Sequence, residues 1–213
     1  MTQALQKLIE IGGEALGPAN AMPDVASLAS GAAPIANELA ELLMQKNGFF
    51  AFEAALHVFP WESRGAEVGL QAWNSPDLWI GEYQGMADGC LFFAEDIFGG
   101  QFCVGEGGIY QFDPETGEKT KIASGAEEWA DAILRDYRVL TGYPLAHQWQ
   151  QLHGAIAPGY RLVPKVPFVV GGEFEIENLY LLDAVRAMRL RASFAVQIRD
   201  LPDGAKIKFT IGP

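Results

Sequence analysis

Residues 90–123 contain four short runs of aromatic and β-branched residues, each separated from the next by a turn. The runs are CLFFAED, QFCV, GIYQFD and EKTKIA, and the segments between them contain glycine. This pattern is typical of an antiparallel β-meander. In the last turn, Pro114 presets φ for a type I turn, and Gly117 supplies the left-handed residue that closes the hairpin.

Two predicted helices, residues 35–46 and 125–141, bracket the meander. Their apolar residues recur at helical spacing, namely Ile35, Leu39, Leu42 and Leu43 in the first and Trp129, Ile133, Tyr137 and Leu140 in the second. Ser124 and Glu127 have the spacing of a capping box, and Gly142 is placed to end the second helix. We expect both helices to back the sheet, because their apolar stripes need a common core.

The N-terminal part of the chain gives weaker signals. Residues 1–11 suit a short amphipathic helix, and the following Gly, Ala, Pro and Ser residues suggest an arm as far as residue 34. Residues 49–60 fit either a strand or a short buried helix, since periodicity does not decide short apolar runs. In residues 74–85, Ser75 as N-cap and the spacing of Leu78, Trp79 and Tyr83 predict a short surface helix.

The C-terminal part, residues 143–213, mixes helical and extended patterns. A helix is predicted within 144–154, an extended segment within 161–176, and a turn followed by a last strand within 201–211. Residues 183–200 favour a helix, although the spacing of Met188, Leu190, Phe194, Val196 and Ile198 also suits a strand. The predicted organisation is therefore an arm (1–34), an α+β domain (35–142), and an α/β extension packed on or beside it (143–213).

Charge is distributed unevenly along the chain. Residues 1–142 carry 21 Asp and Glu against 7 Lys and Arg, whereas residues 143–213 carry 6 against 8. Between Glu53 and Glu118, twelve acids accompany a single base, Arg64. Such a region repels nucleic acid and anionic membranes and suits a basic protein partner. Acidity that only maintains solubility is the alternative.

The sequence carries no signal for export or for spanning a membrane. Its first residues, MTQALQKLIEIGG, lack a basic region and a long apolar region, and Glu53 and His57 interrupt the longest apolar stretch. We therefore expect a soluble cytoplasmic protein. The two cysteines, Cys90 and Cys103, are too few for a disulfide scaffold and are interpreted as free buried thiols.

Glu95 and Asp96 are adjacent carboxylates at the end of a predicted strand, just before a turn that contains Gly99 and Gly100. Successive side chains of a strand point to opposite faces, so at most one of the two faces a given pocket. This excludes a paired-carboxylate glycosidase site built from them. An Asp before such a turn is favoured because its side chain accepts backbone N–H groups. The turn role is therefore preferred over a reactive site.

No metal, phosphate or cofactor site is predicted. The three histidines are too far apart for a shared metal, no calcium loop is present, and the glycines of 105–108 lie between strands instead of opening a helix. A dyad of Cys103 with His57 or His147 stays open, because such partners meet only in space. Four arginines in 186–199 are interpreted as a solvated face or as partners for the acidic part: Arg186, Arg189, Arg191 and Arg199.

Three features between residues 35 and 142 occur in a recognisable order. They are Asn47-Gly48 after the first helix, the aromatic strand that ends at Asp96, and the EEWA helix after the meander. In this order the chain resembles the SUKH superfamily, which includes the yeast cell-wall-assembly regulator and many bacterial immunity proteins. The resemblance implies a non-enzymatic, usually cytoplasmic, α+β domain that neutralises a toxin, often a nuclease. Residues 143–213 depart from that pattern and are expected to dock on the sheet, form a homodimer, or serve a different partner.

The leading hypothesis is a cytoplasmic protein-binding module without catalytic residues, an immunity protein that neutralises a basic toxin domain by steric and electrostatic occlusion. A housekeeping scaffold or regulator of the same fold is the first alternative, and an unrecognised hydrolase that uses Glu95 or Cys103 is the second. The partner-binding residues are expected to be acids in loops and at the ends of strands or helices, namely Glu62, Glu82, Asp88, Glu95, Asp96 and Glu106.

Overall fold

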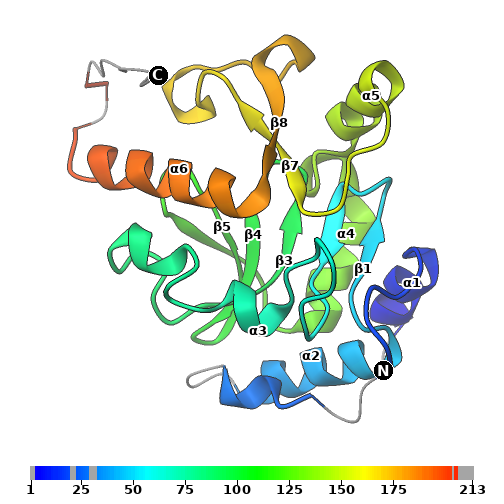
Figure 1. The fold of residues 1–213 in the computed structure, drawn as a ribbon. Coiled ribbons are helices and arrows are strands. Elements are labelled where there is room, and N and C mark those ends of the chain that lie inside the picture. The colour runs from blue at the N-terminus through cyan, green and yellow to red at the C-terminus, as the bar shows by residue number, and fades with distance from the viewer. Residues whose placement is uncertain (1–2, 20–22, 29–32, 203, 206–213) are drawn as a thin grey trace.

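The computed structural model describes residues 3–19, 23–28, 33–202 and 204–205 (Figure 1). Its centre is a six-stranded antiparallel sheet in which strands that follow one another in the chain are neighbours in space. The strands are β1 (Phe49–Ala51), β2 (Leu56–Val58), β3 (Leu91–Asp96), β4 (Gln101–Gly105), β5 (Gly108–Phe112) and β6 (Lys119–Ala123). The α+β class and the predicted meander over 90–123 are confirmed, and Gly117 has the expected positive φ of 74°.

Residues 49–60, which the sequence left open, form the β1–β2 hairpin. Its turn has three consecutive residues with positive φ, at Phe52, Glu53 and Ala54. A left-handed conformation costs a non-glycine residue roughly 1–2 kcal/mol, so contacts from α5 (Tyr143–His153) must hold this turn. Gln150 Nε2 donates to the carbonyl of Glu53 at 2.8 Å, and His147 Nδ1 lies 2.8 Å from the carboxylate of Glu53.

Helices α2 (Ala33–Gln45) and α4 (Ala126–Leu140) share one buried core with the sheet, as predicted. Trp129 of α4 packs edge-on against Phe93 and Phe102, with ring centroids 4.9 and 5.8 Å apart. On the other side, the short helix α3 (Leu70–Trp73) and residues 79–83 bring further aromatic rings onto the sheet. The sheet is therefore covered on both faces.

The predicted surface helix over 74–85 is wrong. Only a short 3-10 turn, Ile80–Tyr83, forms there, and Trp79 and Tyr83 are completely buried. The ring of Trp79 lies 4.8 Å from that of Phe92, and the hydroxyl of Tyr83 donates to the carbonyl of Pro114 at 2.8 Å. Tertiary packing of large aromatic side chains thus outweighs the local helix signal.

The predicted capping box of Ser124 and Glu127 is also wrong. The carboxylate of Glu127 accepts instead from the backbone N–H groups of Ala4 and Leu5, at 2.8 and 3.0 Å. It thereby caps helix α1 (Gln3–Ile11), whose free N–H groups need an acceptor. The N-terminal helix is held on α4, with Leu5, Leu8 and Ile9 buried.

The C-terminal part packs against one end of the sheet (Figure 1). Strands β7 (Tyr160–Pro164) and β8 (Leu179–Asp183) pair as a second antiparallel sheet, and helix α6 (Ala184–Ile198) follows directly. Leu162 N donates to Ile97 O at 2.9 Å, and Met188 of α6 is part of the main core. Helices α5 and α6 confirm the helices predicted in 144–154 and 183–200. Most of the strand predicted in 201–211 lies outside the described residues.

None of the helices in these described ranges is long and apolar enough to cross a membrane.

Candidate functional site

Glu95 and Asp96, at the end of β3, are both buried, with 2% and 7% of their surfaces exposed. Glu95 faces His57, its partner across the β2–β3 pair. Asp96 instead turns back into the β3–β4 hairpin. The two carboxylates therefore enter different environments, as expected from the alternation of side chains along a strand.

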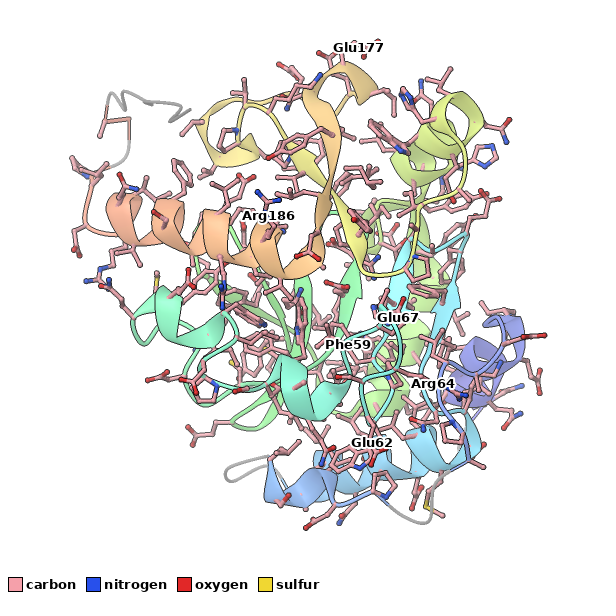
Figure 2. All side chains as sticks on the ribbon, in the orientation of Figure 1. Phe59, Glu62, Arg64, Glu67, Glu177 and Arg186 are labelled. Atoms are coloured by element: carbon pink, nitrogen blue, oxygen red, sulfur yellow. The ribbon has the colours of Figure 1, made fainter. Side chains whose placement is uncertain are left out.

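Glu95 belongs to a group that we call the interior ion cluster, formed by His57, Glu67, Glu95 and Arg161. All four residues are buried. Glu95 Oε1 lies 2.7 Å from Arg161 Nη2 and 3.1 Å from His57 Nδ1. The other ring nitrogen, His57 Nε2, lies 3.2 Å from Glu67 Oε2. Figure 2 shows Glu67 on the loop that precedes α3, with Glu62 of the same loop on the side of α2.

Burial determines the protonation state of this cluster. It lowers the pKa of His57 to about 4, so the imidazole is neutral at pH 7, and it raises the pKa of Glu67. Burial would also raise the pKa of Glu95, but Arg161 and His57 hold it below its ordinary value. A neutral imidazole donates through one nitrogen only. His57 Nδ1 therefore donates to Glu95, whereas His57 Nε2 and both carboxylate oxygens of Glu67 have no hydrogen-bond partner among the described residues.

The second oxygen of Glu95 is occupied as well. Gln101 Nε2 donates to Glu95 Oε2 at 3.1 Å, and Trp73 Nε1 donates to Gln101 Oε1 at 2.8 Å. Gln101 and Trp73 are themselves buried. Both carboxylate oxygens are therefore engaged, and the interior ion cluster joins β2, β3, β4 and β7 as a structural element.

Asp96 organises the β3–β4 turn. Its Oδ1 accepts from the backbone N–H groups of Phe98 and Gly100, both at 2.8 Å, which confirms the predicted turn role. Gly100 is required there because a Cβ atom would lie 2.4 Å from Asp96 Oδ2. Burial raises the pKa of Asp96 to about 7, against the opposing effect of the two N–H groups.

Beside Asp96 lies a cavity of about 390 Å³, which we call the hairpin pocket. It opens where the β3–β4 turn and the β5–β6 turn meet α6 and the segment between β7 and β8. Its volume is near the lower end of the range of ligand pockets, roughly 300–1,000 Å³. The pocket is thus large enough for a side chain or a small ligand.

One wall of the hairpin pocket is acidic. Its carboxyl groups belong to Asp96, Asp113, Glu115 and Glu118. Glu115 is only 4% exposed, and its Oε2 accepts from Val169 N at 2.9 Å. Its Oε1 has no hydrogen-bond partner among the described residues. Burial raises the pKa of Glu115, which expresses the cost of holding this charge away from water.

A second wall is aromatic and reaches the surface. The rings of Phe168 and Phe174 stack in parallel at 3.9 Å, and the ring of Phe98 meets both edge-on. Phe174 and Val139 line the pocket yet remain 64% and 73% exposed. Asp113 and Glu118 are exposed as well, so the rim of the pocket carries both apolar and acidic side chains, whereas Asp96 and Glu115 are buried.

Arg191 is the one cation that lines the hairpin pocket within the described residues. Its Nη1 donates to the carbonyl of Phe98, and its Nε donates to the carbonyl of Ala187 at 3.2 Å. It is 5% exposed, which corrects the interpretation of Arg191 as part of a solvated face. Arg189 does pair with the acidic part of the chain, through Glu82 at 3.1 Å.

The six predicted partner-binding acids do not form one group. Glu62, Glu82, Asp88 and Glu106 are exposed. Glu106 lies in the β4–β5 turn, at the opposite end of β4 from Asp96. The expectation that Glu95 and Asp96 belong to an exposed binding surface is corrected, because their oxygens are needed by buried internal partners.

Several residues of the hairpin pocket were missed by the sequence interpretation. Asp113, Glu115 and Glu118 lie in the stretch DPETGE, which was interpreted only as a turn. Three acids within one hairpin turn were a usable signal. Phe174 follows two glycines in an extended segment and gave no comparable signal.

The remaining candidate groups lie apart from the hairpin pocket. Cys90 and Cys103 are free thiols in contact with each other; this contact lowers the pKa of half-buried Cys90 to about 7 and, together with burial, raises the pKa of Cys103 well above its ordinary value. His147 is engaged with Glu53. Within the described ranges, no three His, Cys, Asp or Glu side chains are grouped so that they could hold a metal ion.

Comparison with known proteins gives one informative likeness, and it concerns the fold. The sequence matches no protein-family model and no curated protein. Among solved structures, the chain is similar to Atu4351 from Agrobacterium tumefaciens, with a TM-score of 0.54 and 15% sequence identity. The similarity covers 87% of this chain and 86% of that chain, so it extends over both the meander and the C-terminal part.

Proposed function

We propose that the protein is a non-enzymatic, SUKH-like binding module that acts as an immunity protein by occluding the basic substrate cleft of a toxin. The observation that carries this proposal is the hairpin pocket, in which acidic side chains lie beside exposed apolar ones. Protein interfaces favour an anchor residue inserted into a desolvated pocket, and complementary charge steers the partner toward it. A basic partner surface fits both properties.

The distribution of charge supports the same proposal. The exposed acids Glu62, Asp88 and Glu106 lie in loops and turns in the part of the chain that contains one base between residues 53 and 118. Their field attracts a cationic partner over distances beyond contact. A nuclease whose cleft binds the phosphate backbone has the complementary charge.

The state of the interior groups favours binding over hydrolysis. Both oxygens of Glu95 are engaged by internal donors, and Cys103 is a buried thiol whose pKa is raised. A catalytic carboxylate or thiolate needs access to substrate and a suitable pKa. These two groups have neither.

The test is co-expression with the products of the genes that adjoin this one in its source genome. We expect one of them to be a basic toxin whose expression stops growth, and we expect the protein to restore growth and to form a stoichiometric complex with it. If the protein forms a complex with a neighbouring gene product that is not toxic, its function is that of a scaffold of the same fold and not that of an inhibitor. Unrestored growth, with no complex between the purified proteins, would contradict the proposal.

A further inference from the structure

The hairpin pocket has an excess of negative charge that its own cation does not neutralise. Four carboxyl groups and one guanidinium line it. Arg191 donates to backbone carbonyls, and among the described residues it makes no ion pair with a carboxylate. An anionic ligand would meet the exposed acids Asp113 and Glu118 in this space, beside Asp96, whose pKa burial raises to about 7. The charge of the pocket therefore selects a cation.

The free oxygen of Glu115 points to the same chemistry independently of the charge count. Glu115 is more than nine-tenths buried, and its Oε1 lacks a donor within the described residues. A buried acceptor without a partner is costly, and more so when it is charged. Oε1 itself has almost no accessible surface, so a donor that enters the pocket satisfies it once the Glu115 side chain turns toward the pocket.

The aromatic wall distinguishes between the cations that could enter. The stacked rings of Phe168 and Phe174 line the same pocket as the acids, and Phe174 is largely exposed. A guanidinium is planar and weakly hydrated, stacks on ring faces, and donates to several acceptors at once. An ammonium is compact and strongly hydrated, so it gains less from the same wall. A metal ion is disfavoured because no three ligating groups converge among the described residues.

We infer that the hairpin pocket binds the guanidinium of an arginine side chain of the protein partner, with Glu115 as its buried acceptor and Phe174 as its stacking face. This inference rests on the proposed function for the source of the arginine. The side chain enters past the rim formed by Phe174 and Val139, and the outer carboxylates of Asp113 and Glu118 attract it. It acts as the central anchor of the interface.

The first experiment uses small probes and needs no partner. N-acetyl-arginine methylamide is titrated into the protein by NMR, with the lysine and citrulline methylamides as matched probes. We expect the arginine probe to bind with a Kd on the order of 1 mM, typical of a single anchor, and at least five-fold more tightly than the lysine probe. The neutral citrulline probe should not saturate. Equal binding of the three probes would overturn the inference.

Substitutions test whether the arginine probe binds in the hairpin pocket. Glu115→Gln retains an oxygen for Val169 N but removes the charge, and it should weaken arginine binding by roughly ten-fold, the value of a charge-assisted hydrogen bond. Phe174→Ala, at an exposed ring, should weaken it by about three- to five-fold. Glu41→Gln is the matched control, because it removes an exposed charge on α2, apart from the acids proposed to attract the partner, and should change nothing. Unchanged binding in both Glu115→Gln and Phe174→Ala would overturn the inference.

The same variants separate this inference from the proposed function. If the toxin complex forms and Glu115→Gln and Phe174→Ala leave its affinity unchanged, the pocket inference fails and the proposed function stands. If the arginine probe binds as expected but no toxin is neutralised, the proposed function fails and the specificity of the pocket for guanidinium is supported. A complex weakened by both variants and not by Glu41→Gln supports both.

Discussion

The interior ion cluster and the hairpin pocket begin at adjacent residues, Glu95 and Asp96, and both place carboxyl groups out of water. In the interior ion cluster, every oxygen of Glu95 has an internal donor, and a guanidinium compensates its charge. In the hairpin pocket, Glu115 keeps one oxygen without a donor among the described residues, and Arg191 binds carbonyls instead of carboxylates. The difference teaches that burial alone does not identify a binding group. What identifies it is a buried charge whose compensation is incomplete on the side of a cavity.

The largest expected effect concerns the interior ion cluster. Arg161→Met keeps the apolar part of the side chain but leaves Glu95 without its guanidinium, and breaking a buried ion pair typically costs about 3–5 kcal/mol. We expect a loss of that size in the free energy of unfolding, measured by urea denaturation. Adding Glu95→Gln should recover much of it, because the uncompensated charge is then gone. A loss below about 1 kcal/mol would contradict this expectation, because it would show that the interior ion cluster contributes no more to stability than a surface ion pair does.

A smaller effect is expected at the β3–β4 turn. Asp96→Ala leaves the N–H groups of Phe98 and Gly100 without an acceptor, each at about 1–3 kcal/mol, and because the Phe98 bond is only partly buried we expect a loss of about 2–4 kcal/mol. Both N–H groups bind the single oxygen Oδ1 in the parent protein, so the amide oxygen of Asp96→Asn can accept both of them, and this variant should lose less stability than Asp96→Ala. Urea denaturation at pH 7 compares the two variants. Equal losses would mean that the charge of Asp96 matters more than its acceptor.

The pH dependence of stability tests the two regions together. The pKa of His57 is about 4 in the folded protein and 6.5 in the unfolded chain. On acidification the unfolded chain therefore binds this proton at a higher pH than the folded protein, and the free energy of unfolding falls between about pH 6.5 and pH 4. Asp96 acts in the opposite direction, because its pKa is about 7 in the fold against 3.8 when unfolded. Its contribution to stability is present below pH 3.8 and is lost as the pH rises to about 7.

Asp96→Asn removes only the second of these contributions. On acidification from pH 6.5 to pH 4.5, we expect this variant to lose up to about 1.4 kcal/mol per pH unit more than the parent, the value of one proton. Urea midpoints at three pH values measure the difference. Parallel profiles of variant and parent would show that Asp96 does not bind a proton in this range.

At the hairpin pocket, the expected effect on stability has the opposite sign. Glu115→Gln removes a buried charge that lacks full compensation, so we expect the free energy of unfolding to stay constant or to rise by about 0.5–1 kcal/mol. The same urea experiments measure it. A loss above 1 kcal/mol would show that Glu115 is structural, and the contrast between the two regions would then disappear.

The smallest effect on stability is expected for the exposed acids. The triple variant Glu62→Lys, Asp88→Lys and Glu106→Lys should change the free energy of unfolding by about 0.5 kcal/mol or less per site. Its association with a captured basic partner should be slower and less dependent on salt, because charge acts mainly on the encounter. Association rates at low and high salt measure this. An unchanged salt dependence would show that these acids only maintain solubility.

The part of the fold that could be predicted is the part determined by local pattern. Short strands between glycine turns predicted the meander, and the turn at Pro114 and Gly117 was predicted from its own residues. The β1–β2 hairpin could not be predicted, because Glu53 adopts positive φ only with the support of α5. Trp79 was misassigned because its ring contributes to a core whose other members are distant in sequence.

In the candidate site too, the features set by local sequence could be predicted and those set by tertiary packing could not. The turn role of Asp96 follows from its position before two glycines and was predicted. The pocket combines Glu115 with Phe174 and Arg191, three segments that meet only after β7, β8 and α6 have packed on the sheet. Arg161 lies in strand β7, whose sequence is YRLVP, and nothing in that stretch indicates that its guanidinium compensates Glu95. Pairings of this kind depend on tertiary structure.

The position of Arg161 also has a consequence for the chain as it is synthesised. A ribosome delivers β3, with Glu95, well before β7, and segments generally fold in the order in which they emerge. Until β7 arrives, closing the meander would bury a carboxylate with no counterion, which is strongly unfavourable. A nascent chain that stops short of residue 161 therefore has an unfinished core, and it also lacks Phe174 and Arg191 of the pocket. Completion of the interior and appearance of the binding surface are thus coupled to the same late segment of translation.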